Sequence, residues 1–329
     1  MVIVVIRNGG TMNSQDFRTF VEQLGDLSAV QREALAAALA AGGSADEVIA
    51  LIETRFEAAP CCGHCKSERF IRWGRDTTAS PLKRYKCKAC ARTFNALTGT
   101  PLAQLHRRDA WLDYARALVD RTSLRKAAER ADICLETSFR WRHRFLQTAK
   151  NKRASVLTGI VEADETFIRK SAKGSRKIVG RAPRKRGGKA KKPGLSTDDH
   201  DCILIARDRH DATTDHILPD LEGRTFAHFL KPVVAKDAVL VSDGRAAYAA
   251  FARDNGVSHI SLVARIGEYV YECFHIQNVN AYTSRLKGWM APFRGVASRY
   301  LENYLGWRRM IEREGNGHTP RHIIIGALE

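Results

Sequence analysis

Residues 159–168 read GIVEADETFI, a stretch that decides the fold class because its residue types follow the alternation of a β-strand. One predicted strand face carries Ile160, Glu162, Asp164 and Thr166, and the opposite face carries Val161, Ala163, Glu165 and Phe167. Two acids on the same side of a strand are unusual in a protein core, so Glu162 and Asp164 need a functional reason.

Further apolar runs after this stretch alternate with helical patterns. They read CILIARD at 202–208 and AVLVSDG at 238–244, and the helix-like RAAYAAFARDNG follows at 245–256. Such an order predicts a mixed α/β domain. Asp243 ends one of these strands just before a glycine, where α/β folds place chemistry. The alternative for Asp243 is a helix N-cap.

A third element, the helix predicted at 278–290, carries polar side chains on one stripe. Asn280, Ser284 and Lys287 share this stripe, whereas Tyr282, Leu286 and Trp289 form the core face. Asn280 and Lys287 are two turns apart, about 10 Å along the axis, so an oxygen donor and a cation point the same way. Asn280 could instead be an N-cap, and Lys287 could simply be solvated.

Towards the N-terminus, two C-x-x-C pairs predict a metal site. Cys62 and Cys65 are separated by 21 residues from Cys87 and Cys90, and two such knuckles complete a tetrahedral zinc site. Cys61 could replace Cys62, which keeps the tighter spacing, and we interpret His64 as a knuckle residue rather than a ligand. The remaining thiols, Cys134, Cys202 and Cys273, are expected to be buried.

Residues 123–148 have the pattern of a helix-turn-helix. Phe139 and Phe145 are core candidates of its second helix. The side chains predicted to meet bases and phosphates are Thr137, Arg140, His143 and Arg144.

The net charge indicates a polyanionic partner. The chain has 329 residues, 54 Lys plus Arg against 36 Asp plus Glu, and a net charge of +18. Residues 169–192 hold 12 of the basic residues and no acid, among them Arg184, Lys185 and Arg186, and should form a loop or extended hairpin. Nucleic acid is the expected partner. No apolar run is long enough to span a membrane and no secretory signal is evident, so we expect a cytoplasmic, nucleoid-associated protein without a membrane partner.

These motifs occur in an order that resembles the bacterial insertion-sequence transposases of the RNase H-like DDE superfamily. More narrowly, the chain is similar to the "fifteen-ninety-five" insertion-sequence family, some members of which replace the third acid with Asn in a D-D-N-K pattern. The matching stretches are RYKCKACARTFNALTGTPL (84–102), TSFRWRHRFL (137–146), VEADETF (161–167), VSDGRAAY (241–248) and HIQNVNAYTSRLKGWMAPFRGVASRYLENYLGWRR (275–309).

The resemblance implies an α/β, RNase H-like catalytic core behind DNA-binding modules. The expected parts are a helical segment (1–58), a zinc ribbon (59–100), a helix-turn-helix domain (101–150), a catalytic domain (156–310) with the basic insertion 169–192, and a tail (311–329). The zinc ribbon and helix-turn-helix would recognise terminal inverted repeats in double-stranded DNA.

The resemblance also implies a mechanism: metal-dependent cleavage at element ends and strand transfer into target DNA. Asp164, Asp243 and Asn280 would bind two Mg²⁺ (or Mn²⁺) ions, Lys287 would hold a DNA phosphate, and Glu162 is the runner-up ligand. Because two DNA ends must meet, a homodimer or higher multimer is expected. Two alternatives are an inactive or domesticated DNA-binding regulator and a nuclease that cuts without joining.

Overall fold

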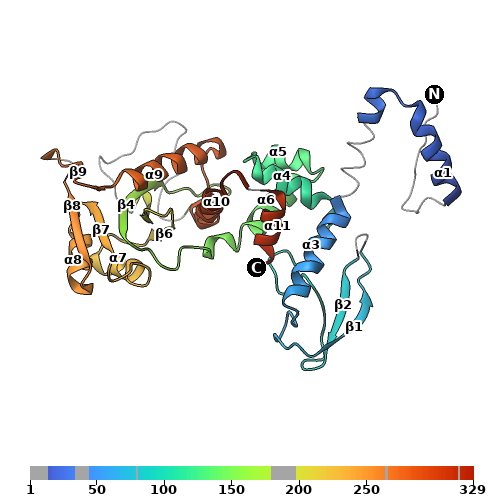
Figure 1. Ribbon diagram of the computed structural model, residues 1–329, viewed down its shortest axis with the longest axis horizontal. Coiled ribbons are helices and arrows are strands. Elements are labelled where there is room, and N and C mark those ends of the chain that lie inside the picture. Colours follow the sequence, from blue (N-terminus) through green and yellow to red (C-terminus); the bar gives the residue numbers. More distant parts are fainter. Residues whose placement is uncertain (1–13, 34–43, 79–80, 179–197, 264–265, 318) are drawn as a thin grey trace.

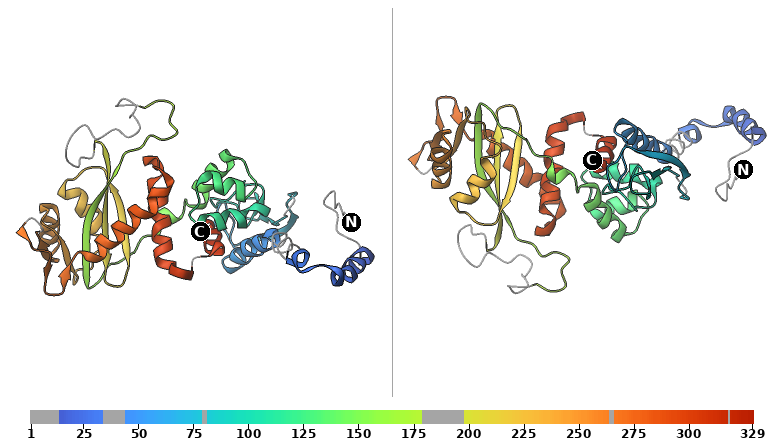
Figure 2. Two further views of the ribbon diagram at one scale, coloured as in Figure 1. Left: turned by 90° about the horizontal axis from the view of Figure 1, so that it is seen from above. Right: turned by 90° about the horizontal axis from the view of Figure 1, so that it is seen from below.

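A computed structural model describes residues 14–33, 44–78, 81–178, 198–263, 266–317 and 319–329. Figures 1 and 2 show an elongated molecule with an α/β part at one end and a helical and ribbon part nearer the other. Two short helical elements, α1 (Ser14–Gln23) and the 3-10 turn Leu24–Asp26, extend beyond the ribbon. No helix in these ranges is long and apolar enough to cross a membrane.

The ribbon part packs a helix against a small antiparallel sheet. Helix α3 (Ser44–Ala58) covers β1 (Phe70–Arg75), β2 (Lys83–Cys87) and β3 (Thr93–Asn95). An aromatic cluster fills the interface, with ring centroids 5.0 to 6.1 Å apart among Phe56, Phe70, Tyr85 and Phe94. Aromatic packing of this kind gives a small module a core that its few residues would otherwise lack.

Three helices follow: α4 (Trp111–Val119), α5 (Leu124–Arg130) and α6 (Leu135–Phe145). The Ser123 hydroxyl caps α5 by accepting from the Lys126 N–H, as expected of an N-cap serine. Residues 311–329, which the sequence analysis sets apart as a tail, contain the end of α10 and helix α11 (Pro320–Leu328). Helix α11 packs on α3, α4 and α6 and buries Ile323, Ile324 and Leu328.

The α/β part is built on a five-stranded mixed sheet. Its strands are β4 (Ile160–Arg169), β5 (His200–Asp208), β6 (Thr213–Leu218), β7 (Val239–Asp243) and β8 (Ser258–Leu262). They are ordered β6-β5-β4-β7-β8, with the first three antiparallel and the last three parallel.

Helices cover both faces of this sheet. Helices α7 (Gly223–Leu230) and α8 (Ala246–Asn255) lie on one face, and α9 (Gln277–Met290) and α10 (Leu301–Glu314) lie on the other (Figure 1). Strand β5 is therefore buried on both sides. Leu204 packs in the core beneath α7 and α8, and Ile203 and Ile205 pack in the core beneath α9 and α10. This double burial explains why residues 202–206 (CILIA) are continuously apolar.

Shorter elements also occur among the described residues. They include a two-stranded hairpin of β9 (Val270–Tyr271) and β10 (Phe274–His275), and the 3-10 turns Arg108–Ala110, Ala149–Asn151, Ala291–Phe293, Ser298–Tyr300 and Gly315–Gly317.

Helix α10 makes close contacts with both the α/β part and the helical part. A Cβ atom on Gly306 would lie 2.4 Å from the backbone carbonyl of Ala149, in the turn after α6, so only glycine fits there. Arg309 forms a buried ion pair with Asp215 of β6 and donates to the Lys150 carbonyl at 2.9 Å. The sheet and the helical part are thus held through shared buried contacts.

Candidate functional site

Asp164 and Asp243 come together because their strands are parallel neighbours. Ala163 of β4 is paired with Ser242 of β7, and the next residue on each strand is the aspartate. The paired segment ends there, so β4 has no strand neighbour on that side beyond Ala163. Asp164, Asp243 and Glu165 then form a cluster in which one carboxylate oxygen from each residue lies within 4.8 Å of the other two.

Two of the three carboxylates in the cluster have raised pKa values. Burial and the neighbouring Asp243 raise the pKa of Asp164 to about 6. Burial, with Asp243 and Asp164 nearby, raises the pKa of Glu165 to about 7. Arg245 offsets part of this charge, since its Nε lies 3.0 Å from Glu165 Oε2. Three carboxylates this close together form a donor set suited to a divalent cation.

Glu165 is the member of the cluster that sequence reasoning missed. Strict strand alternation assigns it to the face opposite Asp164, and its only sequence signal is that two acids are adjacent at the end of an apolar strand. Because β4 loses its β7 neighbour at this point, side chains from the two faces can converge on Asp243.

Glu162, the runner-up ligand, has another role in the structure. Its carboxylate is fully buried and accepts from the backbone N–H groups of Asn278 (2.7 Å) and Val279 (3.0 Å), and Arg209 Nε lies 3.1 Å away. It therefore satisfies N–H groups in the first turn of α9, where a negative charge also complements the helix dipole.

Helix α9 presents the stripe that the sequence predicts. Asn280 and Lys287 are exposed, while Tyr282 and Leu286 are buried. Lys287 is close enough to Asp164 for its charge to oppose the rise in the pKa of that carboxyl. The N-cap alternatives are wrong: α9 is preceded by Ile276, which places Asn280 inside the first turn, and α8 is preceded by Arg245 rather than Asp243.

The cysteines form a second cluster. Cys62, Cys65, Cys87 and Cys90 have sulfurs within 4.8 Å of one another, with pairs at 3.8 Å (Cys62–Cys90) and 3.6 Å (Cys65–Cys87). Ligands at ~2.3 Å in a tetrahedron lie about 3.8 Å apart, so the spacing fits a bound zinc. The cluster includes Cys62 and not Cys61.

Other thiol predictions are only partly correct. Cys202 is buried as expected, but Cys134 and Cys273 are exposed. Cys134 immediately precedes α6, and Cys273 lies in the turn between β9 and β10, where no core is formed.

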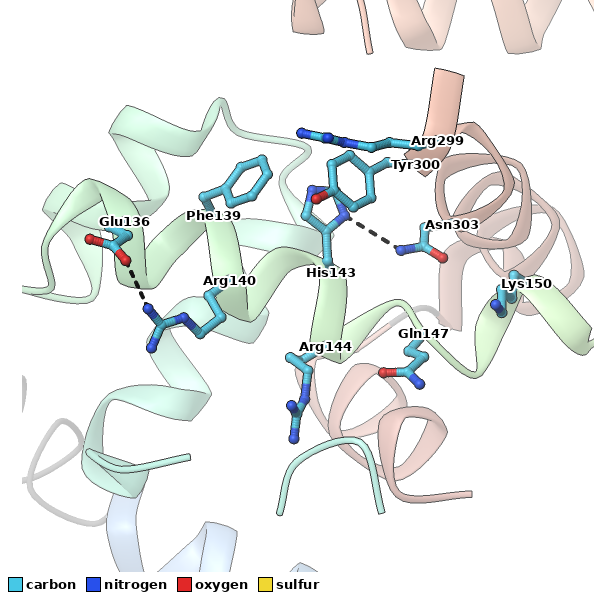
Figure 3. Close-up of a pocket in the computed structure, with 10 residues that line it drawn as sticks. All are labelled: Glu136, Phe139, Arg140, His143, Arg144, Gln147, Lys150, Arg299, Tyr300 and Asn303. Carbon is cyan, nitrogen blue, oxygen red and sulfur yellow. Dashed lines mark hydrogen bonds and ion pairs between the residues drawn. The ribbon is translucent and has the colours of Figure 1, made fainter. Parts of the chain in front are cut away.

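The residues of α6 that are predicted to contact DNA differ in their exposure and in the bonds they already make within the protein (Figure 3). Arg140 is exposed and pairs with Glu136 at 2.8 Å, while Arg144 donates to the Ala103 carbonyl at 2.8 Å. The His143 ring stacks on Tyr300, and burial together with Arg142 and Arg299 lowers the pKa of His143 to about 4. His143 is therefore neutral at neutral pH.

Thr137 and Phe139 of α6 are both partly accessible to solvent. Thr137 is half-buried, with its hydroxyl 3.1 Å from Cys134 Sγ. Phe139 is not a core residue as predicted: it is 38% exposed and contacts Tyr300 edge-on, whereas Phe145 is buried. Arg184, Lys185 and Arg186 of the basic insertion lie outside the described residues.

Comparisons with known proteins identify a family match over the part of the chain that holds this carboxylate cluster. Residues 156–308 match the ISXO2-like transposase domain family. An "Uncharacterized protein in transposable element ISH50" of Halobacterium salinarum is 28% identical over 286 residues, covering 84% of this chain and 95% of the relative.

Two solved structures also align, at low similarity. One is a simian T-cell lymphotropic virus intasome in complex with PP2A regulatory subunit B56 gamma, with a TM-score of 0.28, 8% identity, and coverage of 47% of this chain and 49% of that chain. The other is a pre-cleavage Mos1 transpososome, with a TM-score of 0.25, 13% identity, and coverage of 65% and 78%.

The matched domain, with its carboxylate cluster on a mixed sheet, defines the class of this protein as a transposase. Residues 156–308 match the family of ISXO2-like transposase domains, and this match, together with the transposable-element relative, confirms the resemblance of the sequence motifs to an insertion-sequence transposase.

Proposed function

We propose that this transposase cleaves DNA at the ends of its element and joins those ends to target DNA. One observation carries the proposal: within the matched domain, Asp164 and Asp243 converge from parallel neighbouring strands. The strand order, three antiparallel strands followed by two parallel ones around a central β4, supports an RNase H-like core over residues 156–310.

The residues present fit divalent cations. Three carboxylates converge, and the buried Glu165 Oε1 has no hydrogen-bond partner among the described residues. Mg²⁺ or Mn²⁺ prefers such oxygen donors and, when bound, would activate the attacking oxygen and stabilise the leaving one.

We assign a role to each residue of the proposed site. Asp164 and Asp243 would hold the cations, Asn280 would contribute a carbonyl oxygen, and Glu165 would add a third carboxylate. Lys287 holds a DNA phosphate beside Asp164. Arg245 keeps Glu165 oriented and limits the repulsion among the three acids.

End recognition belongs to the N-terminal half. The zinc-loaded ribbon (59–100) and the helix-turn-helix (101–150) form the DNA-binding region, with α6 as the recognition helix. The pairing of α5 and α6, in which the Ser138 hydroxyl donates to the Leu124 carbonyl at 2.9 Å, supports this assignment. The basic insertion, including Arg184, Lys185 and Arg186, contacts DNA backbone without reading sequence.

The assembly follows from the reaction. Two element ends must be processed together, so the working form is a homodimer or higher multimer on DNA, within the nucleoid of the cytoplasm.

A strand-transfer assay with end duplexes and Mg²⁺ tests the proposal. Wild-type protein should join ends, and Asp164→Asn and Asp243→Asn should abolish joining while leaving end binding intact, because neither removes a basic contact. Arg253→Ala, on exposed α8, is the matched control and should stay active. End binding without cleavage would instead indicate a regulator, and cleavage without joining a nuclease.

The third-ligand assignment has its own test. Asn280→Ala and Glu165→Gln should each lose joining, and Asn280→Asp should keep part of it by restoring an anionic oxygen. Full activity in either of the first two variants would remove that residue from the ligand set.

A further inference from the structure

A pocket of about 590 Å³ lies where α6 meets the start of α10 (Figure 3). Helix α6 supplies Arg140 and Arg144, the turn after it supplies Lys150, and the 3-10 turn Ser298–Tyr300 supplies Arg299. The pocket is therefore shared between the proposed recognition helix and the catalytic half of the chain.

The pocket has a strong excess of positive charge. It is lined by four cations and by one carboxylate, Glu136, which is already paired with Arg140. Arg299 is exposed, and no carboxylate of the described ranges forms an ion pair with it. An anion with several oxygens fits such a lining better than a neutral or cationic group.

Aromatic packing fixes Arg299 in position. The Tyr300 ring stacks on His143 with centroids 3.6 Å apart, and Phe139 meets Tyr300 edge-on at 5.5 Å. The Arg299 guanidinium lies 5.0 Å from the centroid of the Tyr300 ring, on the pocket rim. The cation is thus pre-organised against α6 rather than free on a mobile loop.

The described start of the basic insertion is attached beside Arg299. The Ser298 N–H donates to the Ser171 carbonyl and the Ser171 N–H donates to the Ser298 hydroxyl, both at 2.9 Å. Lys173 Nζ donates to the Gly295 carbonyl at 3.0 Å. The base of the insertion, including the cation Lys173, is therefore held against the segment that carries Arg299.

From this arrangement we infer that the pocket between α6 and α10 binds a backbone phosphate of the duplex that α6 contacts, with Arg299 as its principal ligand. The inference rests on the proposed DNA binding and adds a contact outside the helix-turn-helix. It implies that DNA leaving α6 is held against the turn Ser298–Tyr300, to which the base of the basic insertion is hydrogen-bonded, so one duplex contacts both the helical part and the α/β part.

Binding of a scrambled duplex across a series of salt concentrations tests this. A phosphate contact contributes about −0.9 to the slope of log affinity against log salt, which corresponds to about five-fold in affinity at about 0.15 M salt. Arg299→Ala should therefore bind about five-fold more weakly with a slope shallower by about 0.9, and Arg299→Lys should retain most of the slope. Arg253→Ala removes the same charge from α8 and is the matched control.

The outcomes separate the pocket from the general proposal. Wild-type binding with an unchanged slope in Arg299→Ala overturns the pocket assignment alone. A loss confined to the element's end sequence also overturns it, because a phosphate contact weakens all duplexes alike. If wild-type protein binds no duplex, the proposed function fails together with the pocket. Thermal unfolding of each variant is the control for folding, and we expect these exposed substitutions to leave the unfolding temperature unchanged.

Discussion

Replacing Asp164 with Asn should stabilise the metal-free protein at neutral pH. The folded state holds Asp164 against Asp243 and Glu165, and burial raises its pKa from 3.8 to about 6. The ionised carboxylate is therefore less favourable in the folded than in the unfolded chain. Asn keeps the shape of the side chain and removes its charge.

The sign and size of the effect follow from linkage. A carboxyl whose pKa is raised by folding gives stability below its unfolded pKa and loses it as the pH rises through the folded pKa. A rise from 3.8 to about 6 corresponds to ~3 kcal/mol, which solvent screening at this half-buried position reduces to on the order of 2 kcal/mol. The free energies of unfolding of wild type and Asp164→Asn should thus agree near about pH 4 and diverge towards about pH 7.

Urea unfolding after dialysis against Mg²⁺-free buffer measures this difference without a chelator that would disturb the cysteine site. Added Mg²⁺ should restore the stability of the wild type and not that of Asp164→Asn, because a ligand of the native state stabilises it by mass action. Asp237→Asn, at an exposed position outside the cluster, should retain the Mg²⁺ effect. A wild type more stable than Asp164→Asn throughout this pH range without Mg²⁺ would refute the electrostatic account.

Two further predictions concern the zinc site and the packing of a glycine. We expect about one zinc per chain, which Cys87→Ser should release with loss of ribbon stability and which Cys61→Ser should retain. Metal analysis of the purified variants measures this, and equal zinc content in both would argue against the site. Gly306→Ala should lower the free energy of unfolding by about 3 kcal/mol because its Cβ would overlap Ala149. Gly288→Ala, on an exposed part of α9 with nothing within 4 Å, should instead raise it by about 0.5–1 kcal/mol, and similar effects in the two variants would contradict the packing argument.

Local periodicity predicted much of the architecture. The alternation in 159–168 and the apolar run at 202–208 correspond to β4 and β5, and the stripe on 278–290 has the expected faces. The cysteine spacing likewise predicts the sulfur cluster. These features depend on residues close in sequence, where one repeat distance sets which side chains share a face.

The remaining features depend on where strands stop and on long-range packing. Glu165 joins Asp164 only because β7 ends at Asp243, which alternation cannot show. Phe139 has the spacing of a core residue, yet its partner is Tyr300, far along the chain. Strand alternation predicts Glu162 as a possible metal ligand, but its carboxylate instead accepts hydrogen bonds from backbone N–H groups at the start of α9.

Helix α10 gives a physical reason for recognition and chemistry to be coupled. It begins after Tyr300, which packs on α6, and further along Arg309 pairs with Asp215 of β6. Glu312, near its end, lies 3.4 Å from Arg207 of β5, the strand directly paired with β4. A duplex bound by α6 and Arg299, as we propose, would thereby be fixed relative to the strand that carries Asp164, through ion pairs rather than a flexible linker.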